Sequence, residues 1–149
     1  MRQLVLTMLL LALAAAYGAA KNETVGELKL RFESAHLDDR PELGIRIAQQ
    51  QLRNADKLYS EGNADEARAA VDDIATYSEK ARDAAIQTKK RLKDLEIQAR
   101  KMAAKLRDIK RTLAFENQAP VEQAIRRLED VRTSLLKEMF ANGNKKEQQ

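Results

Sequence analysis

A long interval without helix breakers lies between Gly62 and Pro120, since neither glycine nor proline occurs in it. We expect one long helix over residues 65–115, either continuous or bent near residues 81–88; a continuous helix would be 51 residues or roughly 75 Å long at about 1.5 Å per residue. Its period of 3.5 residues favours left-handed supercoiling with a neighbouring helix. Apolar or small residues recur in this interval at alternating spacings of four and three, and they define a seam: Ala67, Val71, Ile74, Ser78, Ala81, Ala85, Thr88, Leu92, Leu95, Ala99, Met102, Leu106, Ile109 and Leu113.

Two shorter helices are predicted before this interval. Thr24 and Glu27 have the spacing of a capping box, which indicates the start of a first helix. Its apolar positions are Val25, Leu28, Phe32 and Ala35. A second helix is predicted from Pro41 to about Ser60, after Asp39 as its N-cap. One narrow face of this second helix is apolar and needs a partner, comprising Ile45, Ala48, Leu52, Ala55 and Tyr59.

The turns define how these helices connect. Gly62 can adopt the left-handed conformation that ends a helix, and Asn63 is a candidate cap for the next. Pro120 is expected to end the long helix and to begin a last one, which should finish near Ala141. The apolar face predicted for this last helix comprises Val121, Ala124, Ile125, Leu128, Val131, Leu135, Met139 and Phe140.

Short turns on both sides of a long helix force antiparallel hairpins. We therefore expect an all-α fold, an elongated set of antiparallel hairpins or a coiled coil built on one long central helix, with three or four helices. The outer helices should meet near residues 85–92, which would produce a rod two helices thick. The first helix or a second copy of the chain would cover its remaining apolar surface.

The first 20 residues differ from the rest of the chain. A basic start at Arg2 precedes an apolar run, and Gly18 and Ala20 stand at the −3 and −1 positions of a plausible cleavage site. We expect a secretory signal peptide over residues 1–20 and a periplasmic or extracellular location; an uncleaved membrane anchor is the alternative. A single elongated helical domain is expected over residues 21–141, followed by a disordered polar tail over residues 142–149.

Few residues are available for chemistry. The chain contains no cysteine and one histidine, which excludes disulfides, thiol catalysis and Cys-ligated metals. His36 lies beside Asp38 and Asp39, but these three side chains form an incomplete ligand set. No phosphate-binding loop or nucleophile motif occurs. We therefore predict no catalytic, cofactor or metal site, no small-molecule substrate, and a protein that is not an enzyme.

Charge is distributed unevenly over a chain whose formal net charge is +4. Residues 22–79 contain 7 basic and 13 acidic side chains, whereas residues 89–111 contain 10 basic and 3 acidic ones. The basic run could form the charged exterior of a packed helix, or it could contact an anionic envelope polymer, a membrane surface or an acidic protein. Nucleic acid is not expected, because export argues against it and no aromatic residue lies within the run. Its members are Lys89, Lys90, Arg91, Lys93, Arg100, Lys101, Lys105, Arg107, Lys110 and Arg111.

One stretch shows a resemblance to known proteins. Residues 55–68, ADKLYSEGNADEAR, resemble the helix–turn–helix corner of a tetratricopeptide repeat, with Leu58 and Tyr59 before the turn and Ala67 after it. The region 41–85 is similar to the alanine-rich helical hairpins of exported bacterial envelope proteins. This resemblance implies an envelope location and no known activity.

These observations predict a function in binding. We expect an exported, non-enzymatic helical protein that acts as an envelope structural, scaffolding or protein-interaction factor, through a protein partner or self-association. The alternatives are a periplasmic holdase-like chaperone for unfolded clients, or a binder of anionic polymer or membrane surface through residues 89–111.

Overall fold

The computed structural model describes residues 22–146 of the chain, with side chains over residues 22–141. Every element in this range is helical, and none of these helices is long and apolar enough to cross a membrane. The predicted signal peptide, residues 1–20, and the last three residues of the predicted tail lie outside the described range. The helices are α2 (Val25–Ser34), α3 (Arg40–Ser60), α4 (Ala64–Thr88), α5 (Leu92–Thr112) and α6 (Phe115–Lys146).

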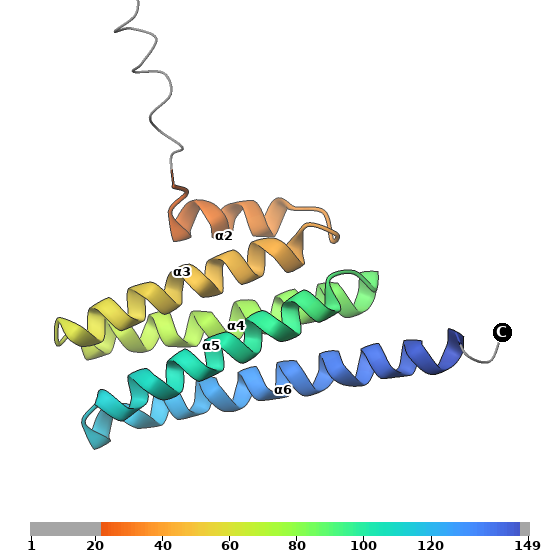
Figure 1. Ribbon diagram of the computed structural model, residues 1–149. Helices are drawn as coiled ribbons and strands as arrows, with labels where there is room; N and C mark the ends of the chain where they lie inside the picture. The colour runs from red at the N-terminus through yellow and green to blue at the C-terminus, as the bar shows by residue number, and fades with distance from the viewer. Residues whose placement is uncertain (1–21, 147–149) are drawn as a thin grey trace, which may run out of the picture.

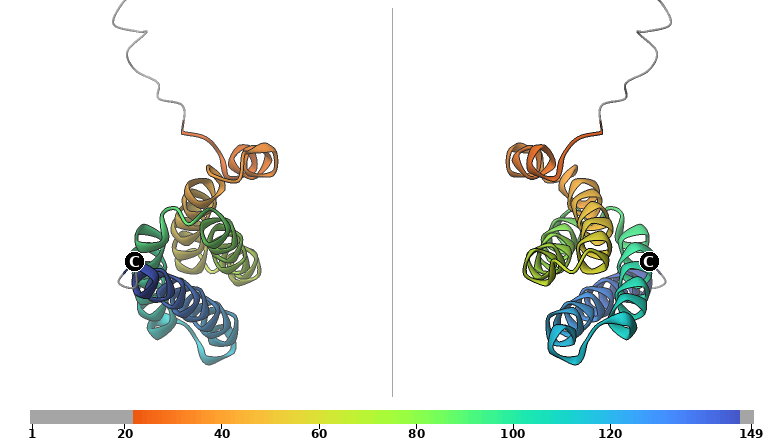
Figure 2. Two further views of the ribbon diagram at one scale, coloured as in Figure 1. Left: turned by 90° about the vertical axis from the view of Figure 1, so that its right-hand side faces the viewer. Right: turned by 90° about the vertical axis from the view of Figure 1, so that its left-hand side faces the viewer.

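Four of these helices form an antiparallel bundle in which the chain direction reverses at each turn (Figure 1). α3 packs along α4 and α5 packs along α6, as the hairpin prediction required. The two hairpins lie side by side, chiefly through contacts between α4 and α6 (Figure 2). α2 lies outside the bundle against α3, and the apolar faces of the two hairpins chiefly cover each other.

The predicted apolar faces account for most of the core. Seam positions from both halves of the predicted long helix are buried, including Ile74 and Leu106, each with none of its surface exposed. One continuous hydrophobic cluster contains residues of α3, α4, α5 and α6. Phe140 is an exception, because 71% of its surface is exposed although the sequence placed it on the apolar face.

Alanine makes up a large part of this core. Among the described residues, 11 of the 28 buried hydrophobic side chains are alanine, which allows the helices to approach closely. One close approach is at Gly44, where a Cβ atom would lie 2.8 Å from the backbone oxygen of Tyr77 and 2.9 Å from the Cβ of Ala81. Glycine is therefore required here by the contact between α3 and α4.

A second, smaller cluster attaches α2. The capping box predicted at its start is present, because Thr24 Oγ1 accepts from Glu27 N–H at 3.2 Å and Glu27 accepts from Thr24 N–H at 2.8 Å. Phe32 meets Tyr77 edge to face, with ring centroids 5.4 Å apart. The ammonium group of Lys80 lies over both rings, which adds a cation–π contribution at the rim of this cluster.

The prediction of one continuous helix over residues 65–115 is wrong. The chain reverses at Lys89, Lys90 and Arg91, which we call the α4–α5 corner, and the described residues form five helices rather than three or four. Lys89 and Arg91 both have left-handed backbone conformations, with φ of 58° and 61°. The seam keeps its phase through the corner, but its second half folds back beside the first. The arrangement is therefore a four-helix bundle and not a rod two helices thick.

Burial explains why the corner forms without glycine. A left-handed conformation costs about 1–2 kcal/mol for each residue other than glycine. Folding back places Leu95, Leu106 and Leu128 in the core shared by both hairpins. Burying a leucine side chain contributes about 1.5–3 kcal/mol. The packing of the two hairpins therefore outweighs the strain of the corner, and this balance cannot be read from local sequence.

The last helix also differs from the prediction at both ends. It begins at Phe115, so Pro120 lies inside α6 instead of ending the preceding helix. The reversal occurs earlier, at Leu113, where the backbone is extended and its N–H donates to the carbonyl of Lys110. α6 continues to Lys146 rather than ending at Ala141, while the disorder of the tail stays a prediction.

Candidate interaction surface on α5

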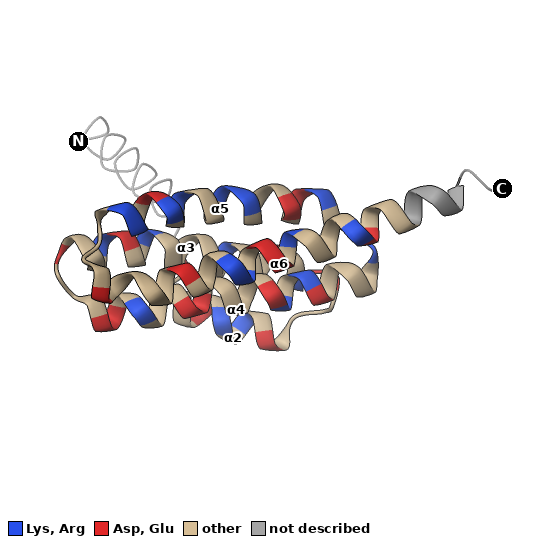
Figure 3. Cartoon of the chain, turned by 90° about the horizontal axis from the view of Figure 1, so that it is seen from below, with Lys and Arg blue, Asp and Glu red and all other residues tan. Residues whose placement is uncertain are grey.

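The predicted basic run occupies two places in the structure. Three of its ten members form the α4–α5 corner, and the other seven lie on α5. α5 buries one face, which carries Leu95, Ala99, Met102, Leu106 and Ile109. Basic residues recur along the length of α5 (Figure 3). We call the exposed basic set opposite the buried face the outer stripe: Lys93, Arg100, Lys101, Arg107 and Arg111.

The corner residues are paired with acidic groups from distant parts of the chain. Lys90 Nζ lies 2.6 Å from a carboxylate oxygen of Asp38 in the loop before α3. Arg91 lies 2.8 Å from Glu42 at the start of α3 and 2.9 Å from Asp94 in the first turn of α5. Lys89 pairs with Glu138 of α6. The corner is therefore held by four carboxylates, three of which come from distant parts of the chain.

Three further members of the run pair with neighbouring helices. Lys105 Nζ lies 3.0 Å from Asp56 on α3, and an Arg107 nitrogen lies 2.6 Å from Glu129 on α6. Lys110 pairs with Glu122 on α6, and this hydrogen bond lowers the pKa of the Glu122 carboxyl. These pairs are partly exposed, so each contributes little to stability. They do reduce the positive charge that this part of the chain presents to a partner.

The remaining members of the run leave charge directed at solvent. Lys93 and Lys101 are exposed and have no ion-pair partner among the described residues. Arg111 and Asp108 form a pair within α5 at 3.0 Å, with 75% and 64% of their side chains exposed. Arg100 lies 3.8 Å from Glu96 of the same helix. Lys93 and Lys101 therefore provide the positive charge on α5 that no internal carboxylate neutralises.

Sequence reasoning missed a polar cluster around Arg127 that is one of the contacts joining the two hairpins. Arg127 of α6 lies 2.7 Å from Asp72 and 2.7 Å from Glu79, both on α4, and it donates to the hydroxyl of Thr76 at 3.0 Å. The hydrogen bond from Arg127 lowers the pKa of the Glu79 carboxyl, and burial opposes this shift. No sequence signal indicated this contact, because its partners are about 50 residues apart and lie on helices predicted not to meet.

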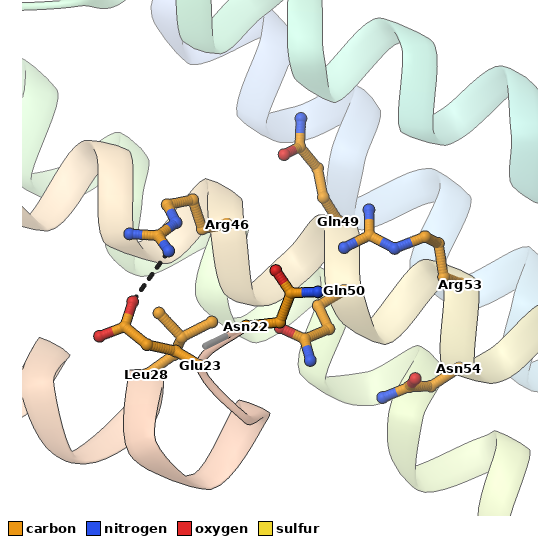
Figure 4. A pocket seen from close by; sticks show the side chains of 8 residues that line it. All are labelled: Asn22, Glu23, Leu28, Arg46, Gln49, Gln50, Arg53 and Asn54. Carbon is orange, nitrogen blue, oxygen red and sulfur yellow. Dashed lines mark hydrogen bonds and ion pairs between the residues drawn. The ribbon is translucent and has the colours of Figure 1, made fainter. Parts of the chain in front are cut away.

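An open polar cavity of about 590 Å³ lies between the start of α2 and the middle of α3 (Figure 4). Arg46 lies at its edge and pairs with Glu23 at 2.8 Å. Arg53 has no ion-pair partner among the described residues. Glu23 and Leu28 line the cavity together with side chains that offer amide or guanidinium groups for hydrogen bonding: Asn22, Arg46, Gln49, Gln50, Arg53 and Asn54.

The structure places the weaker sequence candidates as follows. His36 is exposed in the loop between α2 and α3, and the neighbouring Asp38 is engaged with Lys90. In the part of the chain that the structure describes, no group of three or more His, Cys, Asp or Glu side chains is arranged to hold a metal ion.

Comparison with other proteins adds no relative to these observations. No family model, no curated protein and no solved structure matches this chain. The functional argument therefore depends on the residues of the chain itself.

Proposed function

We propose that this protein is an exported, non-enzymatic helical scaffold that binds an acidic protein partner through the outer stripe of α5. The observation that carries the proposal is the free positive charge of Lys93 and Lys101 on a helix whose other face is buried. Most other basic residues of the run are already paired within the chain. Charge that is left unpaired along one exposed face is suited to complementary contact with an acidic surface.

The spacing of the outer stripe supports a helical partner. Alternating intervals of four and three separate the residues of one row on α5, which includes four members of the outer stripe: Lys93, Ile97, Arg100, Ala104, Arg107 and Arg111. This is the spacing with which one helix meets another along its length. From Lys93 to Arg111 the stripe would extend roughly 27 Å at about 1.5 Å per residue, enough for several turns of a partner helix.

The location and the absence of an activity are part of the same proposal. Residues 1–20 have the pattern of a secretory signal, and the region 41–85 is similar to exported envelope hairpins. A chain with one histidine and no cysteine has few groups for catalysis, which favours a binding function.

The test is site-specific photo-crosslinking in the native cell. A photoreactive residue replaces Ala104, which is exposed at the centre of the outer stripe; the matched control replaces Ala69, which is exposed on α4. We expect a protein adduct from position 104 and none from position 69. The double variant Lys93→Glu/Lys101→Glu should abolish the adduct, whereas Arg53→Glu should not.

The alternatives predict other outcomes. A lipid or polysaccharide adduct at position 104 would show that the stripe contacts a membrane or an anionic polymer, and it would overturn the protein-partner proposal. An adduct that survives charge reversal would show that the stripe does not provide the recognition. Binding of the true partner should also weaken as the salt concentration rises, because exposed charges are screened.

A further inference from the structure

The α4–α5 corner combines two features that conflict. The seam crosses it without a change of phase, since Ala85, Thr88, Leu92 and Leu95 follow at intervals of three, four and three. A straight helix through the corner would therefore keep one continuous apolar face. Yet Lys89 and Arg91 are held in left-handed conformations that lysine and arginine rarely adopt.

The contacts between the two hairpins do not need the corner. α4 packs on α6, and α5 makes smaller contacts with α3 and α4, all between helices that could belong to different chains. Arg127 and its partners on α4 are likewise brought together by packing across the bundle. A second copy of the chain could supply each of these contacts with the same geometry.

We propose that two copies of this chain exchange their α5/α6 hairpins. In each copy α4, the corner and α5 would become one helix over residues 64–112, which is 49 residues or roughly 73 Å long. Each α3/α4 hairpin would then pack against the α5/α6 hairpin of the other copy. The arrangement is closed and two-fold symmetric, because both copies donate and receive the same element.

Two of the ion pairs that hold the corner are largely exposed, so straightening the helix gives them up at little cost. Lys90 and Asp38 have 59% and 53% of their side chains exposed, and Arg91 and Glu42 have 43% and 56% exposed. The pair between Arg91 and Asp94 lies within three residues and is compatible with a continuous helix. Short connections under strain favour exchange of this kind, since the strain is released when the element swaps.

The first experiment measures mass by light scattering, using the full chain refolded at low and at high concentration. We expect a dimer fraction that rises with the concentration during refolding and persists on dilution. Lys89→Gly/Arg91→Gly should reduce that fraction at least several-fold, because glycine adopts the left-handed conformation freely and disfavours a straight helix. The control Ala69→Gly/Ala104→Gly weakens α4 and α5 equally in both forms and should leave the fraction unchanged.

The second experiment distinguishes exchange from any other dimer. The described residues contain no cysteine, so spin labels on Ala69→Cys/Ala104→Cys report one distance within each chain. With labelled chains diluted in unlabelled protein, the straight helix predicts roughly 53 Å for 35 residues, and the folded-back form predicts a much shorter distance. A dimer that shows only the short distance would overturn the proposal. So would a chain that stays monomeric after refolding at high concentration.

The exchange and the proposed function can fail separately. Exchange needs no acidic partner, and its readouts are mass and distance in purified protein. Loss of the crosslink at position 104 would leave those readouts untouched, and a monomer could still bind a partner through the outer stripe.

Discussion

The turn at Gly62 and the α4–α5 corner use the same left-handed backbone conformation with different residues. Gly62 has φ of 80°, and a Cβ atom there would have no neighbour within 4 Å. At the corner, Lys89 and Arg91 adopt this left-handed backbone conformation. The first turn is therefore favoured by its own residue. The second is imposed by packing and ion pairs elsewhere, so its geometry depends on the assembled bundle.

This difference divides the molecule into a locally determined hairpin and a connection determined at long range. α3 and α4 are joined by a glycine turn and meet closely at Gly44. α4 and α5 are joined by a strained corner and share few direct contacts. Substitutions at Gly44, at the corner and at Gly62 should separate the contributions of helix contact, backbone strain and turn conformation to the free energy of unfolding.

The largest effect is expected at Gly44, where contact rather than backbone conformation requires glycine. Gly44→Ala should lower the free energy of unfolding by about 3 kcal/mol, because the new Cβ would meet the Tyr77 backbone. Denaturant unfolding measures this change. Gly26→Ala is the control, since its Cβ would meet only Thr24 Oγ1 at 3.9 Å, and it should be neutral or stabilising. An effect at Gly44 smaller than that at Gly62 would contradict the contact argument.

The next largest change in stability is expected at the α4–α5 corner. Lys89→Gly/Arg91→Gly should be more stable than Lys89→Ala/Arg91→Ala by about 2 kcal/mol, because both variants remove the same ion pairs and only glycine relieves the left-handed strain. Thermal unfolding at low protein concentration, where the chain is monomeric, provides the measurement. Equal stability of the two variants would mean that the corner is not strained.

A smaller loss is expected at the glycine turn. Gly62→Ala should destabilise the protein by about 1 kcal/mol through backbone conformation alone, since no atom obstructs the new side chain. Gly62→Asn should recover part of this loss, because asparagine tolerates the left-handed region better than alanine. If alanine and asparagine behave alike in denaturant unfolding, backbone conformation is not the cause.

The smallest effect concerns pH and the contact between the hairpins. Because Arg127 lowers the pKa of Glu79, this pair contributes stability above the unfolded-state pKa of about 4.3, and the contribution is lost as the pH falls through the lower folded-state pKa. Glu79→Gln should flatten the acid side of the stability curve, by at most about 1 kcal/mol. Arg127→Gln should flatten the same part of the curve. If neither variant changes how stability falls at acid pH, the pair contributes nothing to the stability of the protein.

Local patterns were sufficient to predict the helical faces. Most seam positions from Ala67 to Ile109 are buried, because a helix with an apolar stripe must bury it, while Thr88 and Leu92 on either side of the corner are only half-buried. The capping box of Thr24 and Glu27 and the left-handed Gly62 were also correct. Asn63 occupies the predicted N-cap position, but its side chain makes no capping hydrogen bond.

The reversal at the corner was beyond such patterns. Lysine and arginine carry no turn signal, and the burial that compensates their strain involves residues of α6, more than 25 positions away in sequence. The same limit applies to the basic run. Its residues were identified from sequence, but the neutralisation of Lys105 by Asp56 depends on packing of α5 beside α3 that the rod prediction did not contain. The outer stripe could therefore be identified only from the structure.

The alanine-rich core has a consequence for the response of this protein to temperature. Alanine exposes little apolar surface on unfolding, and apolar exposure is the source of the positive heat-capacity change. With 11 alanines among the 28 buried hydrophobic side chains of the described residues, the protein should therefore have a heat-capacity change per residue below the usual value of about 12–15 cal/mol/K. Its stability should then vary gently with temperature, so that cooling and moderate heating alter it less than in a protein of equal stability with a leucine-rich core.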